Sequence, residues 1–251
     1  MKEIQRILSF ARRAMDDYHM ITPNCKVAVG ISGGKDSMTL LAALSELRRF
    51  YPIPYSLCAI TVDMGFAGSD FFAIQAFCDK IDVEYRVVKT DIAEIVFDVR
   101  KEPNPCSLCS KMRRGVLHST AKEMGADRVA LGHHFDDAVD TFMLNLFFEG
   151  RLGCFSPVSY LSRADLTLIR PLLYAEEKDI RYFVRHSDLP LIESLCPENH
   201  NTERENMKKL LSELEKSNKG LRHRIFGAIC RGELDGFREV GKMPHIKEKD
   251  E

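Results

Sequence analysis

The feature that most constrains the fold is an apolar run that ends in a pair of glycines and passes straight into a helical pattern. The run covers residues 27–31 (VAVGI), the glycines belong to 32–37 (SGGKDS), and the leucines of 40–47 then recur on one stripe. An uninterrupted apolar run is typical of a strand buried in a parallel sheet, and the stripe is typical of a helix that packs on that sheet. This order predicts the first unit of an α/β fold.

The alternation of strand and helix patterns continues along the chain. Apolar runs at 57–62, 84–88 and 128–132 predict three further strands, and helical patterns cover 71–81 and 138–149. Such alternation predicts an open, Rossmann-like parallel sheet with helices on both faces. Ligands of these sheets bind beyond the carboxyl ends of the strands. The glycine turn, Asp63 and the segment 133–137 all fall at such ends.

Both ends of the chain are predicted to add helices to this sheet. We expect an N-terminal helix within 1–24, the α/β domain over 25–200 and a helical extension over 201–251. The first helix is amphipathic and carries charges throughout, which is unlike a secretory signal. In the second half, helices are expected at 176–186, 203–217 and 221–230, a short strand or loop at 167–173, and an irregular loop at 190–200.

Charge and cysteine content narrow the class of protein. The chain has 36 lysines and arginines against 37 aspartates and glutamates, so its net charge is −1 and nucleic acid would bind only to local basic patches. No apolar run reaches the roughly 18 residues of a membrane helix, and a cytoplasmic protein without membrane partners is expected. In that compartment, eight cysteines favour metal or redox chemistry over disulfides.

The residues of the glycine turn suit a bound phosphate. Adjacent glycines let backbone N–H groups approach an anion closely, Lys35 adds a positive charge, and the following helix directs its positive end at the turn. The turn is neither a GxxxxGK[ST] nor a GxGxxG motif. An ordinary glycine-rich connection is the alternative, but the complete hexapeptide favours a polyphosphate site. Its members are Ser32, Gly33, Gly34, Lys35, Asp36 and Ser37.

Two cysteines, Cys106 and Cys109, open a helix that is predicted to run to Gly125. Residues three apart on a helix share a face, and the positive helix end favours thiolates, so both are expected to bind one group. A single CxxC fits a zinc half-site, a redox pair or an iron–sulfur half-site. We choose Cys196 as the third ligand because loops supply ligands readily. Cys58 and Cys78 are expected to be buried, whereas Cys25, Cys154 and Cys230 remain alternatives.

A third motif lies where a predicted strand gives way to a helix. Its candidate residues are Gly132, His133, His134, Asp136 and Asp137. Capping of the helix by Asp137 is the simpler interpretation. The alternative is that the carboxylates hold Mg²⁺ against phosphate oxygens, a role for which Asp36 and Asp63 compete. The two histidines are expected either to contact phosphate or to pack.

The three motifs resemble those of a known family. Residues 30–37 (GISGGKDS) are similar to the PP-loop of the N-type ATP pyrophosphatases, which split ATP between its α- and β-phosphates. With 106–117 (CSLCSKMRRGVL) and 131–137 (LGHHFDD) in this order, they resemble the TtcA family of tRNA 2-thiocytidine synthetases. The resemblance extends to about residue 200. The chain departs from the family pattern in having only Cys196 where a second CxxC is frequent, and Asp140-Thr141 where Glu-Thr is usual.

The resemblance implies a HUP-like PP-loop domain that uses ATP and Mg²⁺, and a [4Fe-4S] cluster held by Cys106, Cys109 and Cys196. It implies that the C2 oxygen of cytidine 32 in the tRNA anticodon loop is activated as an adenylate and replaced by sulfur. The sulfur donor would be a cysteine desulfurase or sulfide, and a homodimer is considered. The catalytic residues would be Lys35, Asp36, Asp136 and Arg113. The nucleotide ligands would be Ser32, Gly33, Gly34, Lys35, Asp36, Ser37, Asp63, Gly132, His133 and Asp137.

Basic residues next to the cysteines (Arg113, Arg114) and at 222–224 (RHR) are expected either to be solvated or to contact the tRNA backbone. Three other functions stay open at this point. One is thiolation of another tRNA nucleoside such as a uridine. Another is an amidating PP-loop ligase of the NAD-synthetase type with a metal-binding CxxC, which would not need three cysteines. The third is a non-catalytic iron–sulfur or zinc RNA-binding module, which would not need an intact phosphate loop.

Overall fold

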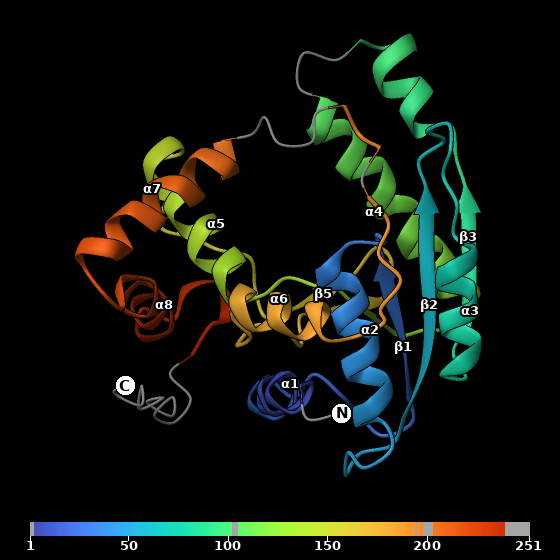
Figure 1. Ribbon diagram of the computed structural model, residues 1–251, viewed down its shortest axis with the longest axis horizontal. Coiled ribbons are helices and arrows are strands. Elements are labelled where there is room, and N and C mark those ends of the chain that lie inside the picture. Colours follow the sequence, from blue (N-terminus) through green and yellow to red (C-terminus); the bar gives the residue numbers. More distant parts are fainter. Residues whose placement is uncertain (1–2, 102–104, 194, 198–202, 239–251) are drawn as a thin grey trace.

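A six-stranded sheet forms the centre of the computed structural model, which describes residues 3–101, 105–193, 195–197 and 203–238 (Figure 1). Its strands are β1 (Cys25–Ile31), β2 (Tyr55–Asp63), β3 (Glu84–Lys89), β4 (Arg128–Ala130), β5 (Val158–Leu161) and β6 (Leu166–Ile169). Their order is β3-β2-β1-β4-β6-β5, and only β5 is antiparallel to its neighbour. The expected α/β sheet is confirmed. Because β2 and β4 flank β1, the connections diverge there, and a crevice is expected beyond its carboxyl end.

Helices cover both faces of the sheet and extend beyond it on one side (Figure 1). They are α1 (Gln5–Asp17), α2 (Lys35–Leu47), α3 (Phe72–Lys80), α4 (Pro105–Glu123), α5 (Phe135–Phe148), α6 (Glu177–Arg185), α7 (Glu203–Ser217) and α8 (Leu221–Arg231). A π-helical turn, η1 (Glu94–Val99), and a 3₁₀ turn, η2 (Leu234–Gly236), complete the set in the described residues. Each of these helices is too short or too polar to span a lipid bilayer.

The alternation of side chains along β1 divides the core into two clusters. Val27 and Val29 belong to the larger cluster, which includes residues of α1, α2, α5 and α6, whereas Ala28 belongs to a smaller one that includes Leu117 and Ala121 of α4. Successive side chains of a strand point to opposite faces. The strand that leads into the glycine turn is therefore buried on both faces, as its unbroken apolar run predicts.

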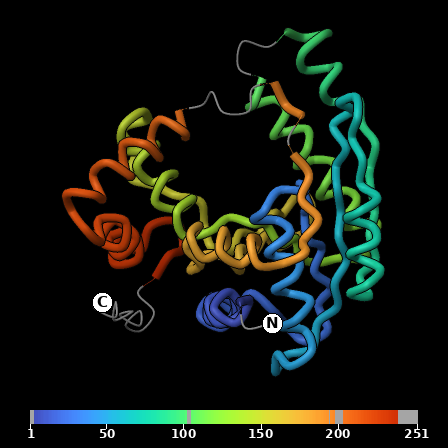
Figure 2. Tube along the Cα trace, in the orientation of Figure 1, coloured from blue at the N-terminus to red at the C-terminus, as the bar shows by residue number. Residues whose placement is uncertain are grey.

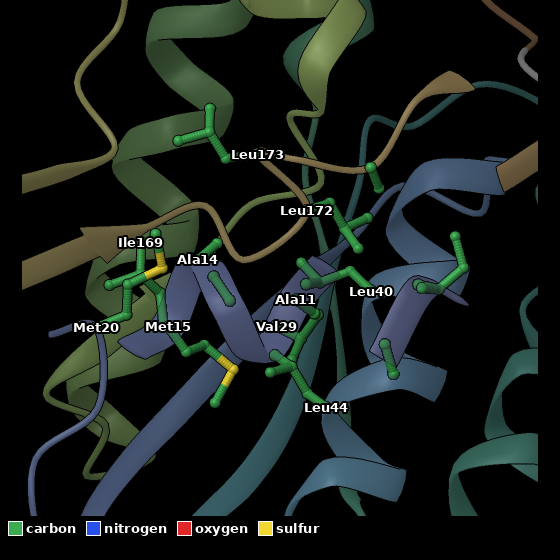
Figure 3. Close-up of a cluster of buried hydrophobic side chains, with 14 of the residues drawn as sticks. Ala11, Ala14, Met15, Met20, Val29, Leu40, Leu44, Ile169, Leu172 and Leu173 are labelled. Carbon is green, nitrogen blue, oxygen red and sulfur yellow. The ribbon is translucent and has the colours of Figure 1, made fainter. Parts of the chain in front are cut away.

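The first helix is packed into the larger cluster rather than standing apart from the sheet. Ala11, Ala14 and Met15 of α1 lie beside Val29 and the leucines of α2 in the close-up of this cluster (Figure 3), and all three are fully buried. Small side chains at two of these positions let the helix approach closely. The apolar stripe of α1 is thus accounted for by packing.

Most element boundaries lie within a few residues of those expected. Helix α5 begins at Phe135 instead of Ala138, because the carboxylate of Asp137 accepts the backbone N–H of His134 at 3.0 Å and so caps an earlier turn. The region 167–173 contains β6, followed by turns. Three elements were missed, β5, η1 and η2. All three are short and lie within segments that carry no clear periodic signal.

Candidate active site

The glycine turn is a closed loop of hydrogen bonds between β1 and α2. The hydroxyl of Ser37 accepts the backbone N–H of Ser32 at 3.1 Å and donates to the carbonyl of Gly34 at 3.0 Å. Gly33 has a φ of +81°, a conformation that favours glycine. These contacts hold the turn over the N-terminal end of α2, where backbone N–H groups and the helix dipole attract anions.

A second glycine lets the third motif reach this turn. A β-carbon placed on Gly132 would lie 3.1 Å from both the carbonyl carbon of Asp36 and the backbone nitrogen of Ser37. The segment after β4 therefore packs directly against the first turn of α2. The structure brings Gly132 and the residues that follow it to the phosphate loop, as the carboxyl-edge argument predicts.

Lys35 lies between two carboxylates. Its ammonium group is 2.9 Å from Oδ2 of Asp36 and 3.0 Å from Oε1 of Glu177, at the start of α6. Burial lowers the pKa of Lys35, but the two carboxylates outweigh this effect and the net shift is upward. Burial raises the pKa of Glu177, yet Lys35 and a hydrogen bond from Arg181 bring it down to about 2. Both groups are therefore charged at neutral pH.

Sequence analysis missed Glu177, although a usable signal exists. The residue begins the helix that follows β6, at the same edge of the sheet as Asp63 and the third motif. Its backbone N–H donates to Oδ2 of Asp136 at 2.7 Å. An acidic residue at a helix start on the carboxyl edge satisfies the rule that was applied to the earlier strands, and applying it to β6 would have selected Glu177.

His134 is buried among three carboxylates of the two motifs. Its Nε2 lies 3.5 Å from Oδ2 of Asp137 and 3.6 Å from Oδ1 of Asp36, and its Nδ1 lies 3.9 Å from Oδ2 of Asp136. Burial raises the pKa of Asp137, but contacts with His134 lower it further than burial raises it. The histidine thus joins the carboxylates of α5 to the first turn of α2.

His133 lies beside this group but turns to other partners. Its Nδ1 accepts a hydrogen bond from Nε of Arg170 at 3.3 Å, and its ring is 4.9 Å from that of Phe155. Burial and the charge of Arg170 lower the pKa of His133 to about 4. The imidazole is consequently neutral at physiological pH.

Asp63 occupies the carboxyl end of β2, where its contacts are local in the described residues. Its Oδ1 accepts the backbone N–H of Gly65 at 3.0 Å, and its carbonyl oxygen accepts the hydroxyl of Thr90 at 2.7 Å. These bonds organise the loop after β2. Asp63 shares the edge with the phosphate loop without a recorded contact to Lys35 or Asp36.

The three selected cysteines come together at the same edge. Cys106 and Cys109 occupy the first turn of α4, and both Cys106 and Cys196 lie close enough to Cys109 to influence its pKa. Burial, followed by these two like charges, raises the pKa of Cys109, while Arg113 opposes the rise. Cys106 is exposed, and the other two are half-buried.

The loop with Cys196 is bonded to the phosphate loop. The backbone N–H of Ile192 donates to the carbonyl of Gly33 at 2.9 Å. The segment after α6 passes the start of α2 and continues to the first turn of α4 (Figure 2). One short segment therefore connects the proposed phosphate site with the proposed cluster site.

The remaining buried cysteines are poor metal ligands. Burial raises the pKa of Cys58 to about 11, and those of Cys78 and Cys154 to about 12. Cys25 is also buried. Because the thiolate is the form that binds metal, the raised pKa values disfavour Cys58, Cys78 and Cys154 as ligands.

The donor set suits a cluster better than a single ion. Among the described residues, no three cysteine, histidine or acidic side chains converge closely enough to hold one metal ion. Cys106 and Cys196 both lie within electrostatic range of Cys109. Iron–sulfur clusters are held by such cysteine thiolates.

The basic residues divide into two kinds. Arg113 is exposed on α4, and its positive charge acts to lower the pKa of Cys109. Arg222, expected to be a surface cation, instead contacts the carboxylates of Asp136 and Asp140 at 3.3 and 3.1 Å, and its side chain is only 17% exposed. Arg204 similarly pairs with Asp137 at 3.2 Å. Helices α7 and α8 therefore supply cations that hold the acidic residues of α5.

Comparison with known proteins agrees with this geometry. The PP-loop domain family model matches residues 5–227. The tRNA-cytidine(32) 2-sulfurtransferase of Syntrophotalea carbinolica is 39% identical over 90% of this chain and 88% of its own, and that of Geobacter sulfurreducens is 37% identical over 90% and 89%.

A solved structure shares the same architecture. The U34-tRNA thiolase NcsA from Methanococcus maripaludis, determined with its [4Fe-4S] cluster, superposes with a TM-score of 0.74 and 28% identity. The match covers 89% of this chain and 77% of the thiolase. From these matches and the site described above, the chain belongs to the PP-loop family and, within it, to the tRNA-cytidine(32) 2-sulfurtransferases.

Proposed function

We propose that the protein is an ATP-dependent tRNA sulfurtransferase that replaces the C2 oxygen of cytidine 32 with sulfur. Family membership supports the substrate and the reaction class. The observation that carries the proposal is the bond between Ile192 and Gly33, which places the cysteine-bearing segment on the phosphate loop. A ligase of the NAD-synthetase type has no use for that arrangement of cysteines.

The first step of the proposed reaction activates the base. The C2 oxygen attacks the α-phosphate of ATP, a new O–P bond forms, and the bond to the β-phosphate breaks to release pyrophosphate. Negative charge grows on the leaving group, so donors located there lower the barrier. The N–H groups and hydroxyls of Ser32, Gly33, Gly34 and Ser37 fit this role, with the charge of Lys35.

Mg²⁺ that accompanies ATP would be held by acidic residues of the two motifs. Both oxygens of Asp136 already accept hydrogen bonds, from Glu177 and Arg222. By contrast, Oδ1 of Asp36 is buried and has no hydrogen-bond partner in the described part of the chain. Since Mg²⁺ takes one or two carboxylates together with phosphate oxygens, Asp36 is the best-suited ligand. Both oxygens of Asp137, like those of Asp136, already accept hydrogen bonds, from His134 and Arg204.

The second step replaces the activated oxygen. Hydrosulfide attacks C2 with its lone pair, the C–O bond breaks, the oxygen departs with AMP, and loss of the proton leaves the 2-thio base. A [4Fe-4S] cluster held by Cys106, Cys109 and Cys196 would leave one iron free of protein ligands to carry sulfide. Arg113 is positioned to offset the negative charge that accumulates near these thiolates.

The same proposal includes the part of the tRNA that is bound, the sulfur donor, the cellular compartment and the oligomeric state. The tRNA is engaged through its anticodon loop, and sulfur comes from a cysteine desulfurase or from sulfide. We place the protein in the cytoplasm, where tRNA is modified, and expect a homodimer, which analytical ultracentrifugation would test.

Nucleoside analysis tests the proposed function directly. Total tRNA from a strain that lacks the gene should contain no 2-thiocytidine, and expression of the wild-type chain should restore it. A variant with Lys35→Ala should not. If mass spectrometry shows loss of a thiolated uridine instead, the proposed substrate, cytidine 32, is wrong. Anaerobic purification should give a brown, iron-containing protein, and a colourless protein with stoichiometric zinc would contradict the cluster.

A further inference from the structure

A groove of about 460 Å³ lies beside the candidate active site, between the starts of α5, α6 and α8 and the end of α7. Asp136 and Glu177 are part of its wall, and Glu177 pairs with Lys35 at 3.0 Å. The side chain of Glu177 therefore connects the groove with Lys35 of the phosphate loop. It is formed partly by α7 and α8, to which the proposed reaction assigns no role.

The chemistry of the lining points to a polyanion. Every lining side chain is charged except that of Ser212. Small-molecule sites are mostly lined by apolar and aromatic side chains with a few polar groups, whereas this groove is lined by charged side chains and contains no aromatic residue among those described. A ligand that is recognised here must be recognised by charge.

The acidic residues of the groove are satisfied internally. Glu177 pairs with Lys35 and with Arg181, and Asp136 accepts the N–H of Glu177 and the guanidinium of Arg222. Glu215 accepts two backbone N–H groups at the start of α8. These carboxylates are held by protein donors, so they oppose an incoming anion less than free carboxylates would.

Four of the five cations that line the groove, in contrast, are exposed; the fifth, Arg222, is held by Asp136 and Asp140. Lys178 and Arg181 have side chains that are 66% and 57% exposed, although each contacts one carboxylate. Lys216 and Lys219 are exposed at and just after the end of α7, and within the described ranges no carboxylate pairs with either of them. The outer rim of the groove is consequently positive while the whole chain carries a net charge of −1.

We propose that this groove binds the phosphodiester backbone of tRNA, with Lys216 and Lys219 as the main phosphate contacts. The inference rests on the proposed function and adds the surface that holds the substrate. Because the chain as a whole does not attract RNA, affinity must come from a local positive surface. A backbone held here passes directly beside Lys35, where the reacting nucleotide must lie.

The test compares two variants that each remove two positive charges. One is K216Q/K219Q in the groove. The matched control is K80Q/R163Q, since both of these residues are exposed and lie on α3 and the β5–β6 connection, away from the groove. Anaerobically purified protein is titrated onto an unmodified tRNA transcript by filter binding at increasing KCl concentration.

We expect K216Q/K219Q to bind tRNA on the order of tenfold more weakly and to lose about 1.5 from the slope of log affinity against log salt, as two lost phosphate contacts predict. The control and K216R/K219R should match the wild type. Equal affinity and equal slope in K216Q/K219Q would overturn the proposal.

Two other outcomes have distinct meanings. Equilibrium dialysis with labelled ATP should give the same affinity for the wild type and K216Q/K219Q, and weaker ATP binding with unchanged tRNA binding would assign the groove to the nucleotide and overturn the proposal. Absence of tRNA binding by the wild-type protein would instead refute the proposed function itself.

Discussion

The backbone N–H of Ile192 donates a 2.9 Å hydrogen bond to the carbonyl oxygen of Gly33, and the Ile192 β-carbon lies 2.9 Å from where a β-carbon on Gly33 would be. The position therefore needs glycine for two independent reasons. One is the close approach of Ile192. The other is the φ of +81°, which side chains rarely adopt.

Gly33→Ala should destabilise the protein by about 1–3 kcal/mol through backbone strain alone and should greatly reduce pyrophosphate release, because the turn and the Ile192 segment are forced apart. The double variant Gly33→Ala/Ile192→Gly should recover part of both losses, since the contact with the Ile192 β-carbon is removed while the strain stays. Urea unfolding and pyrophosphate release measure the two effects. A double variant no better than the single one would show that Ile192 does not restrict this position.

Lys35→Ala should abolish ATP turnover while the cluster is retained, because Lys35 lies in the phosphate turn and Cys106 and Cys109 belong to another element. Pyrophosphate release and the visible absorption spectrum measure these properties on one sample. Lys80→Ala, on α3, is the control. Turnover equal to that of the wild type would refute the assignment of the loop.

Glu177→Gln should change the dependence of stability on pH. The pKa of Glu177 is about 2, below its ordinary value of 4.5, because Lys35 and Arg181 outweigh the effect of burial. A carboxyl group with a lowered folded pKa stabilises the fold above its unfolded pKa, and this stabilisation is lost as the pH falls through the folded pKa.

The free energy of unfolding of the wild type should therefore exceed that of Glu177→Gln at neutral pH. The difference should shrink as the pH falls from about 4.5 to about 2. Denaturant unfolding at a series of pH values measures it, and a difference that stays constant over this interval would contradict the pairing with Lys35.

Arg222→Ala should be strongly destabilising, by about 3–5 kcal/mol, because it leaves the fully buried carboxylate of Asp140 without its cation. Burial already raises the pKa of Asp140 to about 6 despite the nearby Arg222. Arg222→Ala/Asp140→Asn should regain much of the stability, since no charge is then left buried. Calorimetric melting compares the three proteins, and purely additive losses would argue against the pair.

Cys196→Ala should lose the cluster, as should Cys109→Ala. Cys230→Ala is the matched control, because Cys230 lies on α8 and is half-buried like Cys196. Iron content after anaerobic purification is compared between the three variants and the wild type. Full iron in Cys196→Ala would show that Cys196 is not a ligand of the cluster.

The sheet and its functional edge could be predicted because the relevant signals are local in the sequence. A buried strand such as 27–31 shows itself as an apolar run, and the glycine turn follows it directly. Parallel topology then brings distant strand ends to one edge, so Lys35, His134 and Asp136 could be expected to meet.

The partners that complete the site could not be predicted in this way, because their roles depend on packing between distant elements. Arg222 has the composition of a surface cation, yet the docking of α8 on α5 buries it against Asp140. The residues around Ile192 carry no pattern that indicates a hydrogen bond between its backbone N–H and the carbonyl of Gly33. The antiparallel strand β5 was missed because four residues are too few to reveal a period.

The segment that follows α6 has one further consequence. It is anchored to the glycine turn at Ile192 and reaches, four residues later, Cys196, the proposed third ligand of the cluster. Occupancy of either half restricts the same short stretch of backbone, and such restriction is reciprocal in free energy. If Cys196 holds the proposed cluster, binding of the cluster and binding of the nucleotide are thermodynamically linked, and loss of one weakens the other.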